Sequence, residues 1–347
     1  MKTSPSVNLI RLFTIFAIFA GLAVAAGCSS NAQSTGGSPE TIRLDYAYYS
    51  PASLVLKEFG WLEEELEDQG IAVEWVLSQG SNKALEFLNS GSVDFGSTAG
   101  AAALMSKANG APIKNVYLFS KPEWTALVTN AGSGIDSVED LKGKKIAATL
   151  GTDPYIFLLR SLANANVSPD EVEIVNLQHG DGASALSSNQ VDAWAGLDPH
   201  MARVETESGG ELFHRNADLN TYGFLNVREQ FAKEHPEYVD RVIAAYEKAR
   251  KWILENPDET AEILAEEAGI SVEIAAIQLE RTDFSNPIPG DAQRDALNEA
   301  GKVLQEGEVI KQGVDIEATT DSLIDPSFAE ETIELEEGSG QDDEVSK

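Results

Sequence analysis

Apolar residues in the first hundred positions recur in short units that switch between a strand period and a helix period. Residues 71–78 alternate apolar and polar side chains, which predicts a strand, and residues 42–48 predict another. The segment between them has one apolar helical face, formed by Val55, Phe59, Leu62 and Leu66, and we expect Gly70 to end this helix. A short helix from Gly80-Ser81 to Gly91, a strand over residues 93–96 and an Ala-rich helix to about residue 109 follow.

The same strand–turn–helix order returns after residue 132. Two predicted strands, over residues 113–120 and 124–129, precede this second set. The set itself has predicted strands over residues 144–149, 172–177, 191–196 and 222–227. Its predicted helices run from Gly151 to Asn166, over residues 181–188 and from Asp198-Pro199. The remainder, to about residue 328, has mostly helical periodicity. We therefore expect an α/β protein with two similar lobes. Lobe one covers residues 40–125 plus 226–328, and lobe two covers residues 126–225.

The first 40 residues differ from the rest in composition. A basic start precedes an apolar run over residues 12–26, which is short for a membrane span of about 20 residues. The run ends directly before Cys28, the only cysteine, as in bacterial lipoprotein signals, although Ala25 stands where leucine is more usual. We expect residues 1–27 to be a lipoprotein signal peptide, Cys28 to carry the lipid, and residues 28–40 to be a flexible tether. The alternative is a plain secretory signal that leaves Cys28 as a free thiol.

The other end is acidic and poor in apolar residues, so we expect residues 329–347 to form a disordered tail. No run after the leader is long and apolar enough to predict a membrane span. The expected location is therefore outside the cytoplasm. The chain would be lipid-anchored through Cys28 at the outer face of the cell membrane or in the periplasm.

Composition excludes several function classes. The 347 residues include 57 Asp and Glu against 25 Lys and Arg, a net charge of −32, which becomes −34 once the leader is removed. Such a surface repels phosphate backbones, so we expect no nucleic-acid partner. One cysteine and four histidines far apart in sequence predict no disulfide framework and no metal site. No nucleophile elbow, Walker loop or dinucleotide fingerprint is present, so we expect neither an enzyme nor a cofactor.

Small-residue turns join a predicted strand to a predicted helix at four places. They are Gln79-Gly80-Ser81, Ser97-Thr98-Ala99-Gly100, Gly151-Thr152-Asp153-Pro154 and Leu197-Asp198-Pro199-His200. A helix N-terminus offers unpaired N–H groups and a partial positive charge, so it can bind an anion without a basic side chain. Ser, Thr and Asp also cap ordinary helices, and each turn taken alone favours that interpretation. Four such turns in two lobes favour an anion-binding cleft.

Several stretches resemble a known family. They are residues 80–85 (GSNKAL), 88–96 (LNSGSVDFG), 140–147 (DLKGKKIA), 191–194 (VDAW) leading into Asp198-Pro199, and 231–237 (FAKEHPE). In this order, over residues 41–320, the chain is similar to the extracytoplasmic solute-binding proteins of ABC importers, in the group for aliphatic sulfonates, taurine and nitrate. The resemblance implies a type II periplasmic-binding-protein-like fold, in which two hinge strands join the lobes and the cleft binds a small anionic or zwitterionic solute. It also implies a monomer that delivers this solute to an ABC permease with its ATPase.

The resemblance also implies which residues line the cleft. From lobe one these are Gln79, Gly80, Ser81, Thr98, Ala99 and Gly100, and from lobe two Gly151, Thr152, Asp153, Trp194, Asp198 and His200. Tyr49, Trp124 and Tyr222 are aromatic candidates for cleft walls or hinges, although each residue of this type is more often part of a core.

Three of these positions depart from the family pattern and bear on specificity. Relatives often have an aromatic residue before Asp-Pro and a tyrosine after it, where this chain has Leu197 and His200, and a small or aromatic neutral residue where it has Asp153. An aspartate facing the cleft would pair with an ammonium group, whereas one that caps its own helix would not. We therefore hypothesise either an amine-bearing solute such as taurine or a simple alkanesulfonate. Nitrate, a thiamine-precursor pyrimidine and a role as a tethered sensor remain as alternatives.

Overall fold

The computed structural model describes residues 37–334. The predicted signal peptide, the predicted lipidation at Cys28, most of the predicted tether and the part of the predicted tail beyond residue 334 lie outside the described residues. Within residues 37–334, no helix combines the length and apolar character needed to cross a membrane.

A six-stranded sheet carries the first strand–turn–helix units. Its order is β11-β4-β10-β3-β1-β2, with β1 parallel to β2 and β3, and antiparallel pairing from β3 through β10 and β4 to β11. The strands are β1 (Thr41–Tyr46), β2 (Ala72–Leu77), β3 (Phe95–Ala99), β4 (Ile113–Pro122), β10 (Gly223–Arg228) and β11 (Thr282–Asp283). We expected lobe one to resume at residue 226, but β10 already begins at Gly223.

A five-stranded sheet repeats the same plan with the order β7-β6-β8-β5-β9. Its strands are β5 (Thr125–Asn130), β6 (Lys145–Ala148), β7 (Glu173–Asn176), β8 (Ala193–Leu197) and β9 (Gly210–His214). β6 is parallel to β7 and β8, whereas β5 is antiparallel to β8 and β9. β9 was not among the predicted strands. The chain passes between the two sheets at residues 123–124 and again at residues 220–222.

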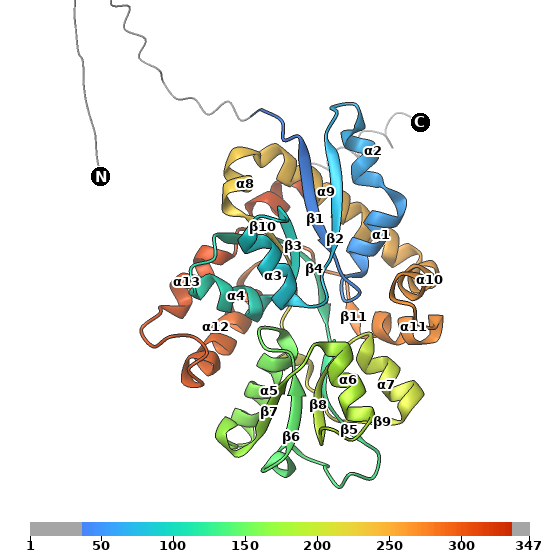
Figure 1. The fold of residues 1–347 in the computed structure, drawn as a ribbon. Coiled ribbons are helices and arrows are strands. Elements are labelled where there is room, and N and C mark those ends of the chain that lie inside the picture. The colour runs from blue at the N-terminus through green and yellow to red at the C-terminus, as the bar shows by residue number, and fades with distance from the viewer. Residues whose placement is uncertain (1–36, 335–347) are drawn as a thin grey trace, which may run out of the picture. The chain divides into compact units, whose positions relative to one another are not determined.

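Helices surround both sheets (Figure 1). Three lie beside the five-stranded sheet: α5 (Asp153–Asn164), α6 (His179–Ser187) and α7 (His200–Ser208). The others are α1 (Pro51–Phe59), α2 (Trp61–Glu67), α3 (Ser81–Ser90), α4 (Gly100–Ala108), α8 (Glu229–Glu234), α9 (Pro236–Glu255), α10 (Pro257–Ala268), α11 (Val272–Glu280), α12 (Asp291–Glu306) and α13 (Ile316–Leu323). Single 3-10 turns cover Val138–Leu141, Pro169–Glu171 and Ala217–Leu219.

Two predicted elements differ from the structure. The helix expected between Val55 and Gly70 is divided into α1 and α2, because Gly60 adopts a left-handed conformation (φ 62°) that ends the first helix. The tail was expected from residue 329, but residues 327–334 are helical. Ala329 and Ile333, one helical turn apart, are buried in the core and hold this segment.

The hydrophobic core follows the two sheets. The main cluster packs on the six-stranded sheet and includes Phe95, Tyr117, Phe224 and Tyr246, all fully buried. Two smaller clusters contain residues of the five-stranded sheet, one with Leu127 and the other with Trp194. Because both sheets are covered by their own helices, the loops at the strand ends remain free to form a site between them.

Candidate ligand-binding site

A cavity of about 180 Å³ lies where loops from the two sheets meet. The six-stranded sheet contributes residues that follow β1 and β2, and the five-stranded sheet contributes residues that follow β7 and β8. The lining residues are Tyr48, Tyr49, Ser78, Gln79, Gln178, His179, Gly180, Asp181, Leu197, Asp198, Pro199 and His200. Ligands of α/β sheets bind at this edge, outside the carboxyl ends of the parallel strands. The volume equals that of about six water molecules at about 30 Å³ each, which suits a small solute.

A much smaller cavity, of about 10 Å³, has Tyr49 and Leu197 in common with the first. Its other lining residues are Ser81, Trp124, Thr152, Asp153 and Pro154. Larger grooves of about 580 and 610 Å³ exist elsewhere, but they lie between the sides of helices, α2 with α9 and α9 with α10 and α11. Of the two cavities described here that both sheets line with residues at their strand ends, the 180 Å³ cavity is the larger.

His179 and Gly80 bring the two sides of the site into contact. His179 is the first residue of α6 and is 1% exposed, whereas Gly80 directly precedes α3. A Cβ atom on Gly80 would lie 2.9 Å from His179 Nε2 and 2.8 Å from Asn82 Oδ1, closer than real Cβ atoms approach. Only glycine therefore lets the imidazole reach this position. His179 Nε2 has no hydrogen-bond partner among the described residues.

The other imidazole nitrogen is held by Thr149. His179 Nδ1 lies 3.2 Å from Thr149 Oγ1, and Thr149 Oγ1 lies 2.7 Å from the carbonyl oxygen of Leu177. Burial lowers the pKa of His179 to about 3, with a further contribution from His200. Burial also lowers the pKa of His200. Both imidazoles are therefore neutral at pH 7.

A buried polar network supports the wall formed by the six-stranded sheet. Tyr49 donates its hydroxyl to the carbonyl oxygen of Ser97 at 2.9 Å. Asp45 accepts hydrogen bonds from Ser78 Oγ (2.5 Å) and from the backbone N–H of Ser97 (2.7 Å). Burial raises the pKa of Asp45 to about 7, and the two hydrogen bonds oppose this shift. Tyr49 and Ser78 are thus fixed in place before any solute binds.

Asp153 connects the two chain segments that pass between the sheets. Its Oδ2 accepts hydrogen bonds from Trp124 Nε1 (2.8 Å) and from the backbone N–H of Thr221 (2.9 Å). Its Oδ1 accepts the hydroxyl of Thr221 at 2.6 Å. Burial raises the pKa of Asp153, whereas the hydrogen bonds from Thr221 and Trp124 lower it. The carboxylate is therefore occupied within the protein and is not aimed at a solute.

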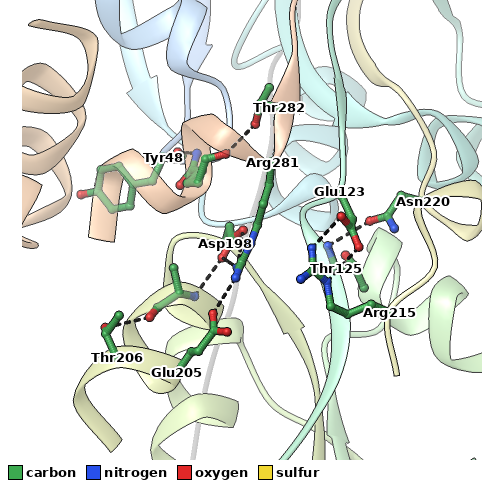
Figure 2. A network of polar contacts seen from close by, with 12 residues as sticks. Tyr48, Glu123, Thr125, Asp198, Glu205, Thr206, Arg215, Asn220, Arg281 and Thr282 are labelled. Carbon is green, nitrogen blue, oxygen red and sulfur yellow. Dashed lines mark hydrogen bonds and ion pairs between the residues drawn. The ribbon is translucent and has the colours of Figure 1, made fainter. Parts of the chain in front are cut away.

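Asp198 is occupied as well, as Figure 2 shows. Its Oδ1 accepts the backbone N–H of Ala202 (2.9 Å), and both oxygens lie 3.2–3.3 Å from Arg281 Nη1. Arg281, which follows α11, also reaches Glu205 on α7 at 2.5 Å. Burial raises the pKa of Asp198 to about 6, and the Arg281 guanidinium opposes this shift. Arg281 thus connects the end of α11 to Asp198 and to α7.

Figure 2 also shows a second set of contacts along the chain passage. Arg215 makes two hydrogen bonds to Glu123 (3.0 and 2.7 Å), and the backbone N–H of Glu123 donates to the carbonyl oxygen of Arg281 (2.7 Å). Asn220 Oδ1 accepts the backbone N–H of Thr125 at 2.9 Å, which connects the two passing segments directly. These contacts, together with those of Asp153, hold the two passing segments in place.

Comparison with known proteins identifies the family. The NMT1/THI5-like family model matches residues 54–260, which is more than half of the chain. The chain belongs to this family. A curated Bacillus subtilis (strain 168) relative, named for binding aliphatic sulfonates, is 28% identical over 332 residues, which cover 94% of this chain and 98% of the relative.

Solved structures confirm the predicted two-lobed, periplasmic-binding-protein-like fold. The alkanesulfonate-binding protein SsuA of Xanthomonas axonopodis pv. citri, bound to MOPS, superposes with a TM-score of 0.75 at 23% identity. The alignment covers 82% of this chain and 98% of that one. The periplasmic aliphatic sulphonate-binding protein SsuA of Escherichia coli gives a TM-score of 0.71 at 25% identity, over 81% of this chain and 97% of that one.

The predicted site residues of this NMT1/THI5-like chain fall into four groups. Tyr49, Gln79, Asp198 and His200 line the 180 Å³ cavity, and Tyr49, Ser81, Trp124, Thr152 and Asp153 line the smaller one. Gly80 and Gly151 lie next to the site: a Cβ atom on Gly80 would lie 2.9 Å from His179 Nε2, and one on Gly151 would lie 3.5 Å from Asn82 Cβ.

The remaining predicted residues line neither cavity. Thr98 Oγ1 donates to the carbonyl oxygen of Ala99 and accepts from Asn226 Nδ2, and Ala99 is fully buried. The backbone N–H of Gly100 donates to the carbonyl oxygen of Tyr222, whose ring packs against the main core. Trp194 is fully buried in the smaller core cluster of the five-stranded sheet.

Sequence reasoning missed the turn before α6. We placed the start of this helix at Asp181, whereas α6 begins at His179, so Gln178, His179 and Gly180 were not considered. The same strand–turn–helix rule that selected the other four turns would have found them. Their residue types hid the turn, because Gln and His are weak capping residues.

Proposed function

We propose that this chain is the solute-binding component of an ABC importer that captures a small sulfonate outside the cytoplasm and releases it unchanged to a permease. The observation that carries the proposal is the 180 Å³ cavity at the strand ends of a two-lobed NMT1/THI5-like chain. The names of the sulfonate-binding relatives support this choice of solute.

The cavity suits a monovalent anion with several acceptor oxygens. Two nine-residue helices, α6 and α7, begin among the lining residues, and the first N–H groups of a helix have no partner inside it. Those groups and the helix dipole favour a sulfonate at this position. The described lining residues include no Lys or Arg, and Asp198 is paired with Arg281. Neutral donors would therefore hold the anion without a salt bridge.

A thermal-shift screen tests this proposal. The purified protein is heated with ethanesulfonate, taurine, nitrate or a hydroxymethylpyrimidine, in a buffer free of sulfonates such as MOPS. A solute that binds only the native state at 100 times its Kd stabilises it by about 2.7 kcal/mol, a shift of several degrees in Tm. We expect this shift with a sulfonate. A shift with nitrate or the pyrimidine alone would reassign the solute, and no shift with any of them would contradict the proposal.

Export and anchoring are part of the same proposal. The leader and its single cysteine support removal of residues 1–27, lipid attachment at Cys28 and a flexible tether up to residue 40. Replacing Cys28 by serine should move the protein from the membrane fraction to the soluble fraction, as measured by fractionation and immunoblotting. Replacing Ser29 by alanine is the matched control and should leave it with the membrane. Membrane association that survives Cys28→Ser would contradict a lipid anchor.

Transport and sensing are separated by a growth experiment. Cells that lack the permease gene should fail to grow with the bound sulfonate as sulfur source, even when this protein is present. Normal uptake without the permease, together with a ligand-dependent change in gene expression, would favour the tethered-sensor alternative.

A further inference from the structure

The hydrogen bonds around Thr149 determine which nitrogen of His179 carries the proton. Thr149 has a single hydroxyl hydrogen, and it donates this hydrogen to the carbonyl oxygen of Leu177 at 2.7 Å. Towards His179 Nδ1, at 3.2 Å, the hydroxyl oxygen therefore acts as the acceptor. The proton of the neutral imidazole is on Nδ1. Nε2 consequently presents a lone pair and needs a donor.

Nothing within the described part of the protein supplies that donor. Nε2 is buried and unpartnered, on a side chain that is 1% exposed. Asn82 Oδ1, on the Gly80 side, is itself an unpartnered acceptor, and Gln178 Oε1 is another. An unpaired acceptor in such a place costs free energy unless a bound molecule satisfies it. His179 lines the 180 Å³ cavity, so a molecule bound there can reach it.

The two buried aspartates near the cavity, Asp153 and Asp198, do not serve a donor-bearing solute. Both oxygens of Asp153 accept hydrogen bonds from Trp124 and Thr221, and Asp198 is engaged by Ala202 and Arg281. Neither of these two carboxylates is therefore free to pair with an ammonium group, and the remaining carboxylate at the cavity, that of Asp181, belongs to a side chain exposed to solvent. His179 Nε2 is the buried acceptor that remains among the residues lining the cavity, beside Gln178 Oε1.

We propose that His179 Nε2 accepts a hydrogen bond from an N–H or O–H group of the solute and thereby selects for sulfonates that carry such a group. This inference rests on the proposed function. The anionic head group lies at the unpaired N–H groups of the helix starts, because a sulfonate oxygen placed against the Nε2 lone pair would be repelled. The donor group of the same molecule lies against His179.

Calorimetric titration with three solutes of similar size tests the inference: taurine, 2-hydroxyethanesulfonate and ethanesulfonate, in Tris buffer at pH 8. We expect the two donor-bearing sulfonates to bind at least about tenfold more tightly than ethanesulfonate, since a satisfied buried acceptor has an effect of that size. Equal binding of all three would overturn the role of His179 but leave sulfonate binding intact. Failure of all three to bind would instead count against the proposed function.

Two variants separate a hydrogen bond from a packing effect. His179→Phe keeps the ring without the acceptor, and it should reduce the preference for the donor-bearing sulfonates to less than about threefold. His179→Gln places an oxygen near the Nε2 position and should retain the preference. A preference that persists in His179→Phe would refute the inference.

An NMR measurement does not depend on these variants folding. The imidazole ¹⁵N shifts of the ligand-free protein should show Nδ1 protonated and Nε2 unprotonated, and the Nε2 resonance should move on addition of taurine. The opposite tautomer would overturn the inference.

Discussion

The hydrogen bonds of Asp153 make a quantitative prediction about stability. Replacing Asp153 by alanine removes the acceptor of Trp124 Nε1–H and of the Thr221 backbone N–H. Trp124 is 3% exposed and Thr221 is 1% exposed, so water cannot easily replace the carboxylate. The Thr221 hydroxyl is less affected, because it can rotate and still accepts the backbone N–H of Ala101 at 3.1 Å.

The expected magnitude follows from the two stranded donors. Each buried donor left without a partner costs about 1–3 kcal/mol, so Asp153→Ala should lower the free energy of unfolding by about 4 kcal/mol. Asp153→Asn retains one oxygen for the two N–H groups and loses the charge, and we expect it to cost about 1–2 kcal/mol. Since folded proteins are stable by only about 5–15 kcal/mol, the alanine variant should be severely weakened.

Urea unfolding at pH 8, followed by tryptophan fluorescence and circular dichroism, measures these differences. Asp295→Ala is the matched control, because Asp295 is exposed on α12, and its effect should stay within about 0.5 kcal/mol. An Asp153→Ala variant within about 1 kcal/mol of the wild type, at an unchanged m value, would show that the two N–H groups find other partners and would refute the reasoning.

Three further predictions concern the site. Arg281→Ala strands the buried Asp198 carboxylate and should cost about 3–5 kcal/mol in urea unfolding at pH 8. The cost should be smaller at pH 5, where Asp198, with its pKa raised to about 6, is already protonated; an equal cost at both pH values would contradict the ion pair. Because the pKa of His179 is lowered to about 3, the wild type should lose stability relative to His179→Phe as the pH falls from about 6.5 towards 3, by up to about 5 kcal/mol. Comparing the two proteins at each pH cancels the opposite contribution of Asp45, and a constant difference would count against a buried neutral imidazole. Gly80→Ala places a methyl group against His179 and should cost about 1–3 kcal/mol and at least about tenfold in solute affinity, by calorimetry; wild-type affinity would show that the imidazole can move away.

Local patterns were sufficient to predict the fold class. Small-residue turns after strands predicted the starts of α3, α4, α5 and α7 to within two residues, because each turn needs residues that permit tight geometry or capping. The left-handed Gly60 was overlooked, because the apolar face continues across it at helical spacing.

The site itself was only partly predictable. Arg281 contacts Asp198, 83 positions earlier, and no local pattern links two such positions. The sequence placed Trp194 in a strand correctly, but alternation alone does not say which face of a strand packs into the core and which faces a cleft. Asp153 accepts hydrogen bonds from Thr221, which is 68 positions later in the sequence. Only the arrangement of the two segments that pass between the sheets brings these residues together.

The close approach of Gly80 and His179 has an evolutionary consequence. A Cβ atom on residue 80 and an imidazole on residue 179 cannot occupy their positions together, since the atoms would be 2.9 Å apart. The side chains at these two positions, nearly a hundred residues apart, therefore compete for the same space. Substitutions at positions 80 and 179 should covary among orthologues. Orthologues with a side chain at position 80 should carry a smaller residue at position 179, and their transporters should import a different set of solutes.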